Sequence, residues 1–349
     1  MTALTAMAIE SSTICPEIAW DISGKWKEQK GKAIRKNMLL DAERAEILRF
    51  LESESIWYLP LKGSVLKDLY PKYGMREMAD NDILIDPAGR EKIFAFMSER
   101  GYTGTSGRGL GHDTYQKPPV YNFELHPVLV SKSSDPVWYA YYETVKERLE
   151  PDADSRYGYH FHDEDFYLYM TVHACKHYRN AGTGLRTLAD AYVFLGQKGE
   201  GLDWDYIGQE ARKLGIDAFE NQLRQLAQRL FADPGQLDDA VLTDEEERML
   251  TVLSGSGTYG TYSNLVANQL SQMETAGAST PKKDKLRYLW NRLFPNMEWF
   301  ENNAPFFAKH RILIPFFWIY RIFRGVLCRG KAIRCELRAV RAFGRQERK

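Results

Sequence analysis

Three acidic residues at the starts or ends of expected strands are the first candidates for chemistry. Asp80 and Asp82 stand in the segment MADNDILID, and Glu124 follows 42 positions after Asp82 in the alternating segment VYNFEL. Residues i and i+2 of a strand point to one face, so a strand over 82–85 would project both aspartates together. Carboxylates that also meet Glu124 from a neighbouring strand would raise one another's pKa unless a cation neutralised them. Mg²⁺, a hard cation that takes oxygen ligands, is the expected occupant.

We therefore predict that Asp80, Asp82 and Glu124 are both metal ligands and catalytic residues. Two Mg²⁺ ions are expected, with Mn²⁺ as the alternative, because ions roughly 3.5–4 Å apart activate an attacking oxygen and stabilise a leaving one. The simpler interpretation of the aspartates is a solvated turn, since aspartate is common in turns. His126 shares a strand face with Glu124 and would contact a phosphate, orient Glu124 or cap the strand.

The turn Lys62-Gly63-Ser64 has the residue types that a phosphate group needs. Glycine lets backbone N–H groups approach an anion closely, and the N-terminus of a helix beginning at Ser64 would favour negative charge. Lys62 and Arg76 would add compensating positive charge. These four residues are the predicted nucleotide-binding residues.

The elements that would position these residues follow from the apolar pattern. Helical spacing is expected over 36–51, from Ser64 onward and after Pro87, and strands over 56–61, 82–85 and 120–125. The pattern then becomes helical, over 163–178, 185–195, 204–214, 218–231 and 244–253. We predict an α+β fold with a small mixed sheet and helices over 30–150, a helical domain over 151–300 and a basic amphipathic segment over 301–349. The Gly-rich segment SGRGLGHD (106–113) predicts a mobile loop.

The order of these motifs resembles the nucleotidyltransferase superfamily typified by DNA polymerase β. In that superfamily a Gly-Ser or Gly-Gly helix start binds the triphosphate, and an Asp-x-Asp with a later acid binds the metals. The resemblance is closer to an uncharacterised bacterial nucleotidyltransferase-like family and covers about residues 35–230. Gly63 lies 17 residues before Asp80, a longer spacing than is common in the wider superfamily. The motifs that carry the resemblance are Leu61-Lys62-Gly63, Tyr70-Pro71, Arg76, Asp80-Asn81-Asp82-Ile83-Leu84 and Glu124-Leu125-His126.

The resemblance implies a polymerase β-like nucleotidyltransferase core followed by an all-α domain. It also implies an Mg²⁺-dependent enzyme that moves a nucleoside monophosphate from an NTP donor to an acceptor and releases pyrophosphate. The acceptor, a small molecule or a protein, is not specified by the sequence. The alternative is a non-catalytic binding or scaffold protein that keeps the fold.

Two histidines in the helical half are further candidates. His173 and His177 lie four positions apart on the helix expected over 163–178, but no glutamate follows His173, so the H-E-x-x-H metal pattern is absent. They are interpreted as core or surface residues, with contact to a substrate as the alternative.

The charge and the cysteines of the sequence limit which partners and which cellular compartment are expected. The net formal charge is zero, which gives no reason to expect a specific nucleic-acid partner. Four cysteines without a CxxC pair and an N-terminus without a signal-peptide pattern predict a cytoplasmic protein.

The C-terminal segment departs from this balance. Between Arg321 and Lys349 ten Lys/Arg stand against two Glu, beside an apolar stripe of Ile322, Val326, Ile333, Leu337 and Val340. Such a basic amphipathic helix predicts a peripheral contact with the inner face of a membrane or with a protein. The alternative is that the stripe packs on the domain and the arginines are solvated.

Overall fold

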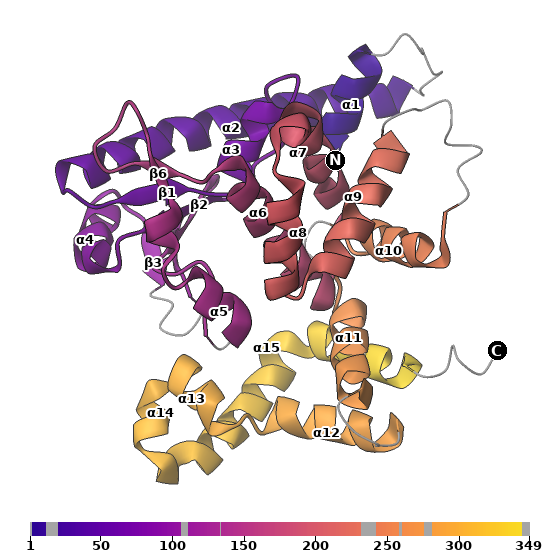
Figure 1. Ribbon diagram of the computed structural model, residues 1–349. Coiled ribbons are helices and arrows are strands. Elements are labelled where there is room, and N and C mark those ends of the chain that lie inside the picture. The colour runs from indigo at the N-terminus through magenta and orange to yellow at the C-terminus, as the bar shows by residue number, and fades with distance from the viewer. Residues whose placement is uncertain are drawn as a thin grey trace. The chain divides into compact units, whose positions relative to one another are not determined.

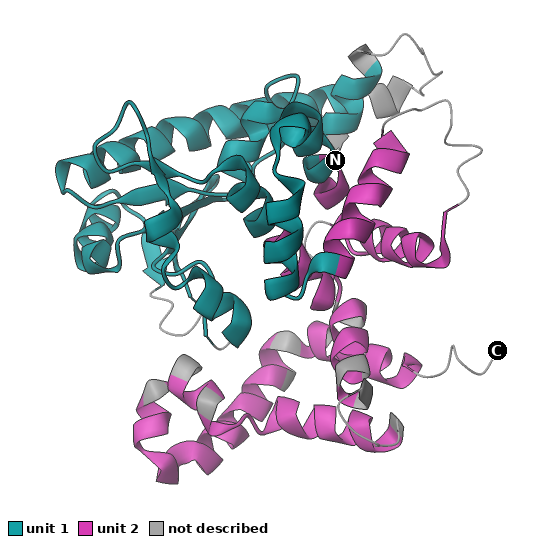
Figure 2. Cartoon of the chain, in the orientation of Figure 1, with its two compact units in different colours: residues 1–170, 190–217 teal, residues 171–189, 218–349 magenta. Residues whose placement is uncertain are grey.

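The computed structural model describes residues 2–11, 20–105, 111–132, 134–231, 242–257, 260–275 and 281–343. The chain forms two compact units, coloured separately in Figure 2. Unit 1 comprises residues 1–170 and 190–217, and unit 2 comprises 171–189 and 218–349. Helices α6 (Asp163–Arg179) and α7 (Arg186–Lys198) each begin in one unit and end in the other. The division into 30–150, 151–300 and 301–349 stays a prediction.

Unit 1 contains a five-stranded mixed sheet, of which Figure 1 labels β1, β2 and β3. The strand order is β1-β2-β5-β4-β3. Only β2 and β5 are parallel neighbours, and the other three pairs are antiparallel. The expected strands over 82–85 and 120–125 correspond to β2 and β5. The five strands are β1 (Tyr58–Pro60), β2 (Asn81–Ile85), β3 (Thr103–Thr105), β4 (Asp113–Lys117) and β5 (Tyr121–His126).

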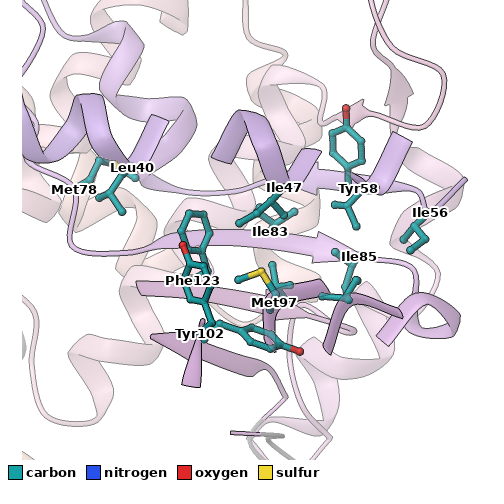
Figure 3. Packing of buried hydrophobic residues seen from close by; sticks show 14 residues of the cluster. Leu40, Ile47, Ile56, Tyr58, Met78, Ile83, Ile85, Met97, Tyr102 and Phe123 are labelled. Atoms are coloured by element: carbon teal, nitrogen blue, oxygen red, sulfur yellow. The ribbon is translucent and has the colours of Figure 1, made fainter. Parts of the chain in front are cut away.

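One face of this sheet carries the hydrophobic core (Figure 3). Ile83 and Ile85 of β2 and Phe123 and Leu125 of β5 are fully buried in a cluster with residues of α2 (Trp20–Ser53) and α4 (Arg90–Glu99). Side chains alternate between the faces of a strand, so the residues between these apolar positions point to the opposite face. Asp82, Glu124 and His126 are such residues.

The segment between β1 and β2 begins with a short helix rather than the longer one expected from Ser64. Helix α3 (Gly63–Leu66) continues only into the 3-10 turn η1 (Lys67–Leu69). Pro71 explains the stop, because the residue before a proline avoids the helical region, and Tyr70 is extended at φ −73° and ψ 146°.

The remaining elements of unit 1 are helical or short. They are α1 (Thr2–Ser11), η2 (Pro87–Gly89), α5 (Pro136–Tyr142), η3 (Val145–Arg148), the two-stranded pair β6 (Glu150–Pro151) and β7 (Tyr159–His160), η4 (Gly199–Gly201) and α8 (Trp204–Lys213).

Unit 2 is helical throughout its described part. Thr243 and Glu246 form a capping box that fixes the start of α10, as the sequence T-D-E-E allows. The prediction of an α+β fold with an all-α region after the sheet is confirmed. The helices of unit 2, besides its parts of α6 and α7, are α9 (Asp217–Phe231), α10 (Asp244–Gly255), α11 (Tyr262–Thr275), α12 (Pro281–Leu293), α13 (Met297–Asn303), α14 (Pro305–Lys309), η6 (Arg311–Leu313) and α15 (Ile314–Ala342).

Among the helices in the described part of the chain, none combines the length and the apolar character that crossing a bilayer requires. The cytoplasmic location stays a prediction.

Candidate active site

The acidic residues predicted as ligands meet on the face of the sheet opposite the core. In the parallel pair, Asp82 lies opposite Glu124 and Leu84 lies opposite His126. Glu124 shares a hydrogen bond with Asp82, and its charge interacts with both Asp82 and Asp80. Asp80 immediately precedes β2 and is half-buried. The structure therefore places Asp82 beside Glu124, with Asp80 near enough for its charge to act on Glu124, and the role of the three carboxylates as one set of metal ligands stays a prediction.

Asp82 is the buried centre of this group, with two nitrogen partners on one oxygen. Lys62 Nζ lies 2.7 Å from Asp82 Oδ1, and His126 Nε2 lies 2.9 Å from the same atom. Burial alone would raise the pKa of Asp82, but the positive charge of Lys62 and the hydrogen bond from His126 hold it well below its usual value. Asp82 is consequently a carboxylate at neutral pH.

Glu124 has the opposite electrostatic character. Burial, followed by the neighbouring charges of Asp82 and Asp80, raises the pKa of Glu124 to about 7. A carboxyl group with that pKa exchanges its proton near neutrality, which suits a general base or a ligand whose proton leaves when a cation arrives.

Two histidines complete the polar face. Burial lowers the pKa of His126 to about 4, so its imidazole is neutral and its Nε2 can donate to Asp82. His112 Nε2 lies 3.7 Å from Glu124 Oε2, and one ligand atom from each of His112, Glu124 and His126 lies within 4.8 Å of the others. The nitrogen of His126 cannot both donate to Asp82 and ligate a cation, which leaves His112 as the nitrogen better placed for a metal.

Lys62 is held in an uncommon backbone conformation. Its φ of 51° and ψ of −116° lie in a region that residues other than glycine rarely adopt. Its carbonyl accepts hydrogen bonds from the N–H groups of Val65 and Leu66, which fixes the turn at the start of α3. Burial would lower the pKa of Lys62, but Asp82 and then the buried phenol of Tyr169 raise it, so the ammonium stays charged. Strain of this kind is found at functional sites, where the surrounding structure maintains it.

Gly63 is required by its packing, whatever the turn binds. A Cβ atom at this position would overlap Nη1 of Arg76 and lie 2.9 Å from Sδ of Met78. Ser64 is buried, and both its N–H, at 3.3 Å, and its Oγ, at 2.7 Å, donate to the carbonyl of Leu61. The phosphate contacts of Gly63 and Ser64 stay predictions.

Arg76 forms a buried clamp with Asp190 of α7. Its Nε and Nη2 donate to the two carboxylate oxygens of Asp190 at 2.8 and 2.9 Å, and the hydroxyl of Tyr70 donates to the same carboxylate at 2.7 Å. A bidentate arginine pair of this type fixes relative position as well as charge. In this arrangement Arg76 holds the segment before β2 against α7, and its nucleotide contact stays a prediction.

His173 and His177 lie on the part of α6 that belongs to unit 2. Their Nε2 atoms are 3.1 Å apart, so the two rings interact with each other. Their predicted contact with substrate stays a prediction.

The sequence interpretation did not single out His112 or Tyr169 as neighbours of the carboxylates. His112 precedes β4, whose antiparallel pairing of Asp113 with Leu125 brings it beside His126, and Arg90 fixes Asp113 with two hydrogen bonds. A hairpin around Pro118-Pro119 was the available signal for this pairing. Of the segment predicted as a mobile loop, residues 106–110 lie outside the described part. Tyr169 lies in an apolar stretch of α6 that carries no distinguishing spacing.

Of three comparisons with known proteins, one identifies a family. Neither the curated proteins nor the solved structures include a match to this chain. A family model described as an uncharacterised nucleotidyltransferase matches residues 2–232, which include the whole sheet and each residue of the candidate site. With its carboxylates on adjacent parallel strands and this match over most of its length, the chain belongs to that nucleotidyltransferase family.

Proposed function

We propose that this protein transfers a nucleoside monophosphate from an NTP to an acceptor and releases pyrophosphate, with Asp80, Asp82 and Glu124 as the metal-binding and catalytic residues. The observation that carries the proposal is the in-register pair of Asp82 and Glu124, in which Glu124 has a pKa raised to about 7. Such a group of carboxylates gains stability from a cation placed among them.

The residues at this site fit a divalent cation. Asp82 and Glu124 supply carboxylate oxygens from adjacent strands, Asp80 adds a third carboxylate nearby, and His112 adds an imidazole nitrogen beside Glu124. Oxygen ligands suit Mg²⁺ and Mn²⁺, whereas imidazole favours the transition metals, so this set is compatible with both ions. When bound, the cation would neutralise the phosphate oxygens and polarise the phosphorus centre.

The chain's own residues supply the remaining parts of the reaction. Glu124, with a pKa near neutrality, is suited to accept the proton of an acceptor hydroxyl. Lys62 carries a buried positive charge beside Asp82, where a negatively charged phosphate would gain from it. The Arg76–Asp190 clamp holds the segment between the Lys62 turn and β2 in place.

One observation favours a second candidate, a non-catalytic protein that binds nucleotide. Oδ1 of Asp82 already has Lys62 and His126 as partners, and the charge of Lys62 neutralises the carboxylate without a metal. A protein that kept only nucleotide binding would tolerate such an internal ion pair.

The experiment combines binding and turnover in one set of variants. The full chain is incubated with Mg²⁺ or Mn²⁺, each α-labelled NTP, and pools of small hydroxyl compounds or proteins, while pyrophosphate release and label transfer are followed. Metal-dependent thermal stabilisation by an NTP is measured in parallel. Asp82→Asn and Glu124→Gln are the test variants. Asp86→Asn, on the residue that follows β2 and caps η2, is the matched control.

We expect metal-dependent label transfer that falls at least about a hundredfold in both test variants and is retained in Asp86→Asn, since the lost groups act directly in the reaction. Stabilisation by NTP without pyrophosphate release would support the non-catalytic candidate instead. If no NTP produced either thermal stabilisation or label transfer, both candidates would be contradicted.

A further inference from the structure

Helix α15 presents an exposed apolar stripe in its N-terminal half. One face of the helix carries Phe316, Ile319, Tyr320, Phe323 and Leu327, in which each residue has another member three or four positions away. Each is between 54% and 81% exposed. A contiguous stripe of this size is uncommon on the surface of a soluble protein and marks an interaction site.

The same face becomes basic in the C-terminal half of the helix. Arg334 lies 18 residues after Phe316, which is five helical turns, and Arg338 and Arg341 follow at spacings of four and three. All three arginines are exposed. One face of α15 is therefore apolar and aromatic along its first half and cationic along its second.

The opposite side of α15 anchors the helix within unit 2. Val340 is buried with Val266 and Leu270 of α11 and Tyr288 of α12. Glu336 is also buried, accepting a hydrogen bond from the hydroxyl of Tyr288 at 2.7 Å and one from Nε of Arg292 at 2.8 Å. Val340, a member of the apolar stripe identified in the sequence, therefore packs inward, and the exposed stripe lies on a different face.

The charge along α15 and the short helices directly before it has one sign. Between residues 302 and 343 the sequence contains nine Lys/Arg and a single acid, the buried Glu336. Further exposed apolar side chains lie in the preceding turn and in α12, where Ile312 and Trp290 are 87% and 64% exposed. Aromatic side chains beside arginines, on a helix whose acid Glu336 is buried, match the chemistry of an anionic lipid headgroup layer above an acyl boundary.

We propose that this face of α15, formed by the stripe Phe316–Leu327 and the arginines Arg334, Arg338 and Arg341, docks on an anionic lipid surface. The apolar half enters the boundary between headgroups and acyl chains, and the arginines contact lipid phosphates. The inference is independent of the proposed reaction, since it uses none of the residues of the candidate active site.

The test uses the full chain with vesicles of defined composition. Sedimentation measures partitioning onto phosphatidylcholine vesicles with and without 30% phosphatidylglycerol, in 0.1 M and 0.5 M NaCl. One variant carries F316S and F323S. A second carries R334E, R338E and R341E. The matched controls are the exposed F94S of unit 1 and the charge-equivalent triple variant R156E, R212E and R248E.

We expect the wild type to bind the anionic vesicles in 0.1 M NaCl. Its binding should be at least tenfold weaker in 0.5 M NaCl and at least tenfold weaker on neutral vesicles. Each α15 variant should bind the anionic vesicles at least tenfold more weakly than the wild type. Both controls should bind like the wild type. Circular dichroism and the thermal midpoint establish that the variants are folded, because each altered side chain is exposed in the structure.

Several outcomes would overturn the proposal. Equal partitioning onto neutral and anionic vesicles would remove the role of the arginines, and unchanged binding in both α15 variants would place the contact elsewhere. No binding to either vesicle would exclude a lipid surface. A dimer detected by light scattering that F316S and F323S dissociate would assign the face to a second copy of the chain.

Discussion

The charge of Glu124 is set by its burial and by the carboxylates of Asp82 and Asp80, which together raise its pKa to about 7. His126, one strand position further along the same face, has its pKa lowered to about 4 by burial. The contributions of these two residues to folding stability therefore change in opposite directions with pH, and Asp82 interacts with both.

The sign of each contribution follows from which state holds the proton. Between about pH 4.5 and 7 the folded protein keeps a proton on Glu124 that the unfolded chain has released, so this group lowers stability as pH rises. His126 raises stability as pH rises from about 4 to 6.5, because in this range the unfolded chain binds a proton on this residue and the folded protein does not. The two slopes oppose each other in the wild type, so a difference measurement is needed.

We predict that Glu124→Gln isolates the contribution of this carboxyl group. Relative to the variant, the metal-free wild type should lose about 3 kcal/mol of unfolding free energy between pH 4.5 and 7.5, from a pKa shift of about 2.5 at about 1.4 kcal/mol per unit. Urea unfolding at several pH values measures the difference. Glu99→Gln, on the exposed surface of α4, is the matched control. A constant difference between wild type and Glu124→Gln across this range would contradict the prediction.

At the scale of elements, the guanidinium group of Arg76 holds the turn before α3 and the segment before β2 together by packing. Arg76 is buried between Gly63 and Asp190, with hydrogen bonds to the carboxylate on one side and a glycine without a side chain on the other. Removing the arginine leaves Asp190 as a buried charge, whereas adding a methyl group at Gly63 displaces the arginine.

We predict that Gly63→Ala and Arg76→Ala are coupled. The first should cost about 1–3 kcal/mol through overpacking and the second about 3–5 kcal/mol through the uncompensated charge. The double variant should be less destabilised than the sum by at least about 1 kcal/mol, since the alanine at position 63 fills space that Arg76 has left. Urea unfolding of the four proteins measures the coupling.

The matched control is Gly196→Ala in α7, where a Cβ meets no atom within 4 Å and helix propensity favours alanine by up to about 1 kcal/mol. If Gly63→Ala were as stable as the wild type but lost nucleotide binding, the reason for the glycine would be ligand approach rather than packing.

The elements that the sequence predicts well are those with a clear local pattern. The apolar run Ile83–Ile85 and the alternation around Phe123 predict β2 and β5. The second half of α2 and helices α6 to α10 follow from apolar periodicity, whereas α11 to α14 were not predicted. Strands β3 and β4 were not predicted, because TGT and DTYQK are polar and are strands only through pairing with each other and with β5.

The residues of the candidate site that belong to a sequence motif were predictable. Their partners, which are set by long-range contacts, were not. The D-x-D pair and the acid of E-L-H are recognisable from the sequence, because Asp80 directly precedes β2 and Asp82 and Glu124 alternate with apolar strand residues. The partners of these residues depend on tertiary packing. Arg76 and Asp190 are 114 positions apart, and Lys62 meets Asp82 through a strained turn that no spacing rule describes.

At the scale of the whole molecule, the net charge is zero, but positive and negative charge are concentrated in different parts of the sequence. Residues 302–343 carry nine Lys/Arg and one Glu, a local charge of +8, so the rest of the chain sums to −8. The sequence isoelectric point is about 7.1, so no net repulsion separates molecules near neutral pH.

We predict salt-reversible self-attraction at neutral pH. In low salt near pH 7 the second virial coefficient from static light scattering should be negative, because basic segments of one molecule attract acidic surfaces of another. It should rise towards zero or above in 0.3 M NaCl, where the screening length is shorter than about 10 Å. Measurement at pH 9, where the net charge is negative, is the control. Attraction that strengthened with salt would indicate apolar rather than electrostatic contacts.

The contact between Lys62 and Asp82 bears on the sequence of events in the proposed reaction. A tethered ammonium group competes with any free ion for the same oxygen, and it never diffuses away. An ion arriving as a nucleotide chelate has an advantage, since its phosphate tail offers the displaced lysine a new counter-charge. In the proposed reaction Lys62 would therefore keep bare magnesium from Asp82, and the metal and the nucleotide would bind together rather than one after the other.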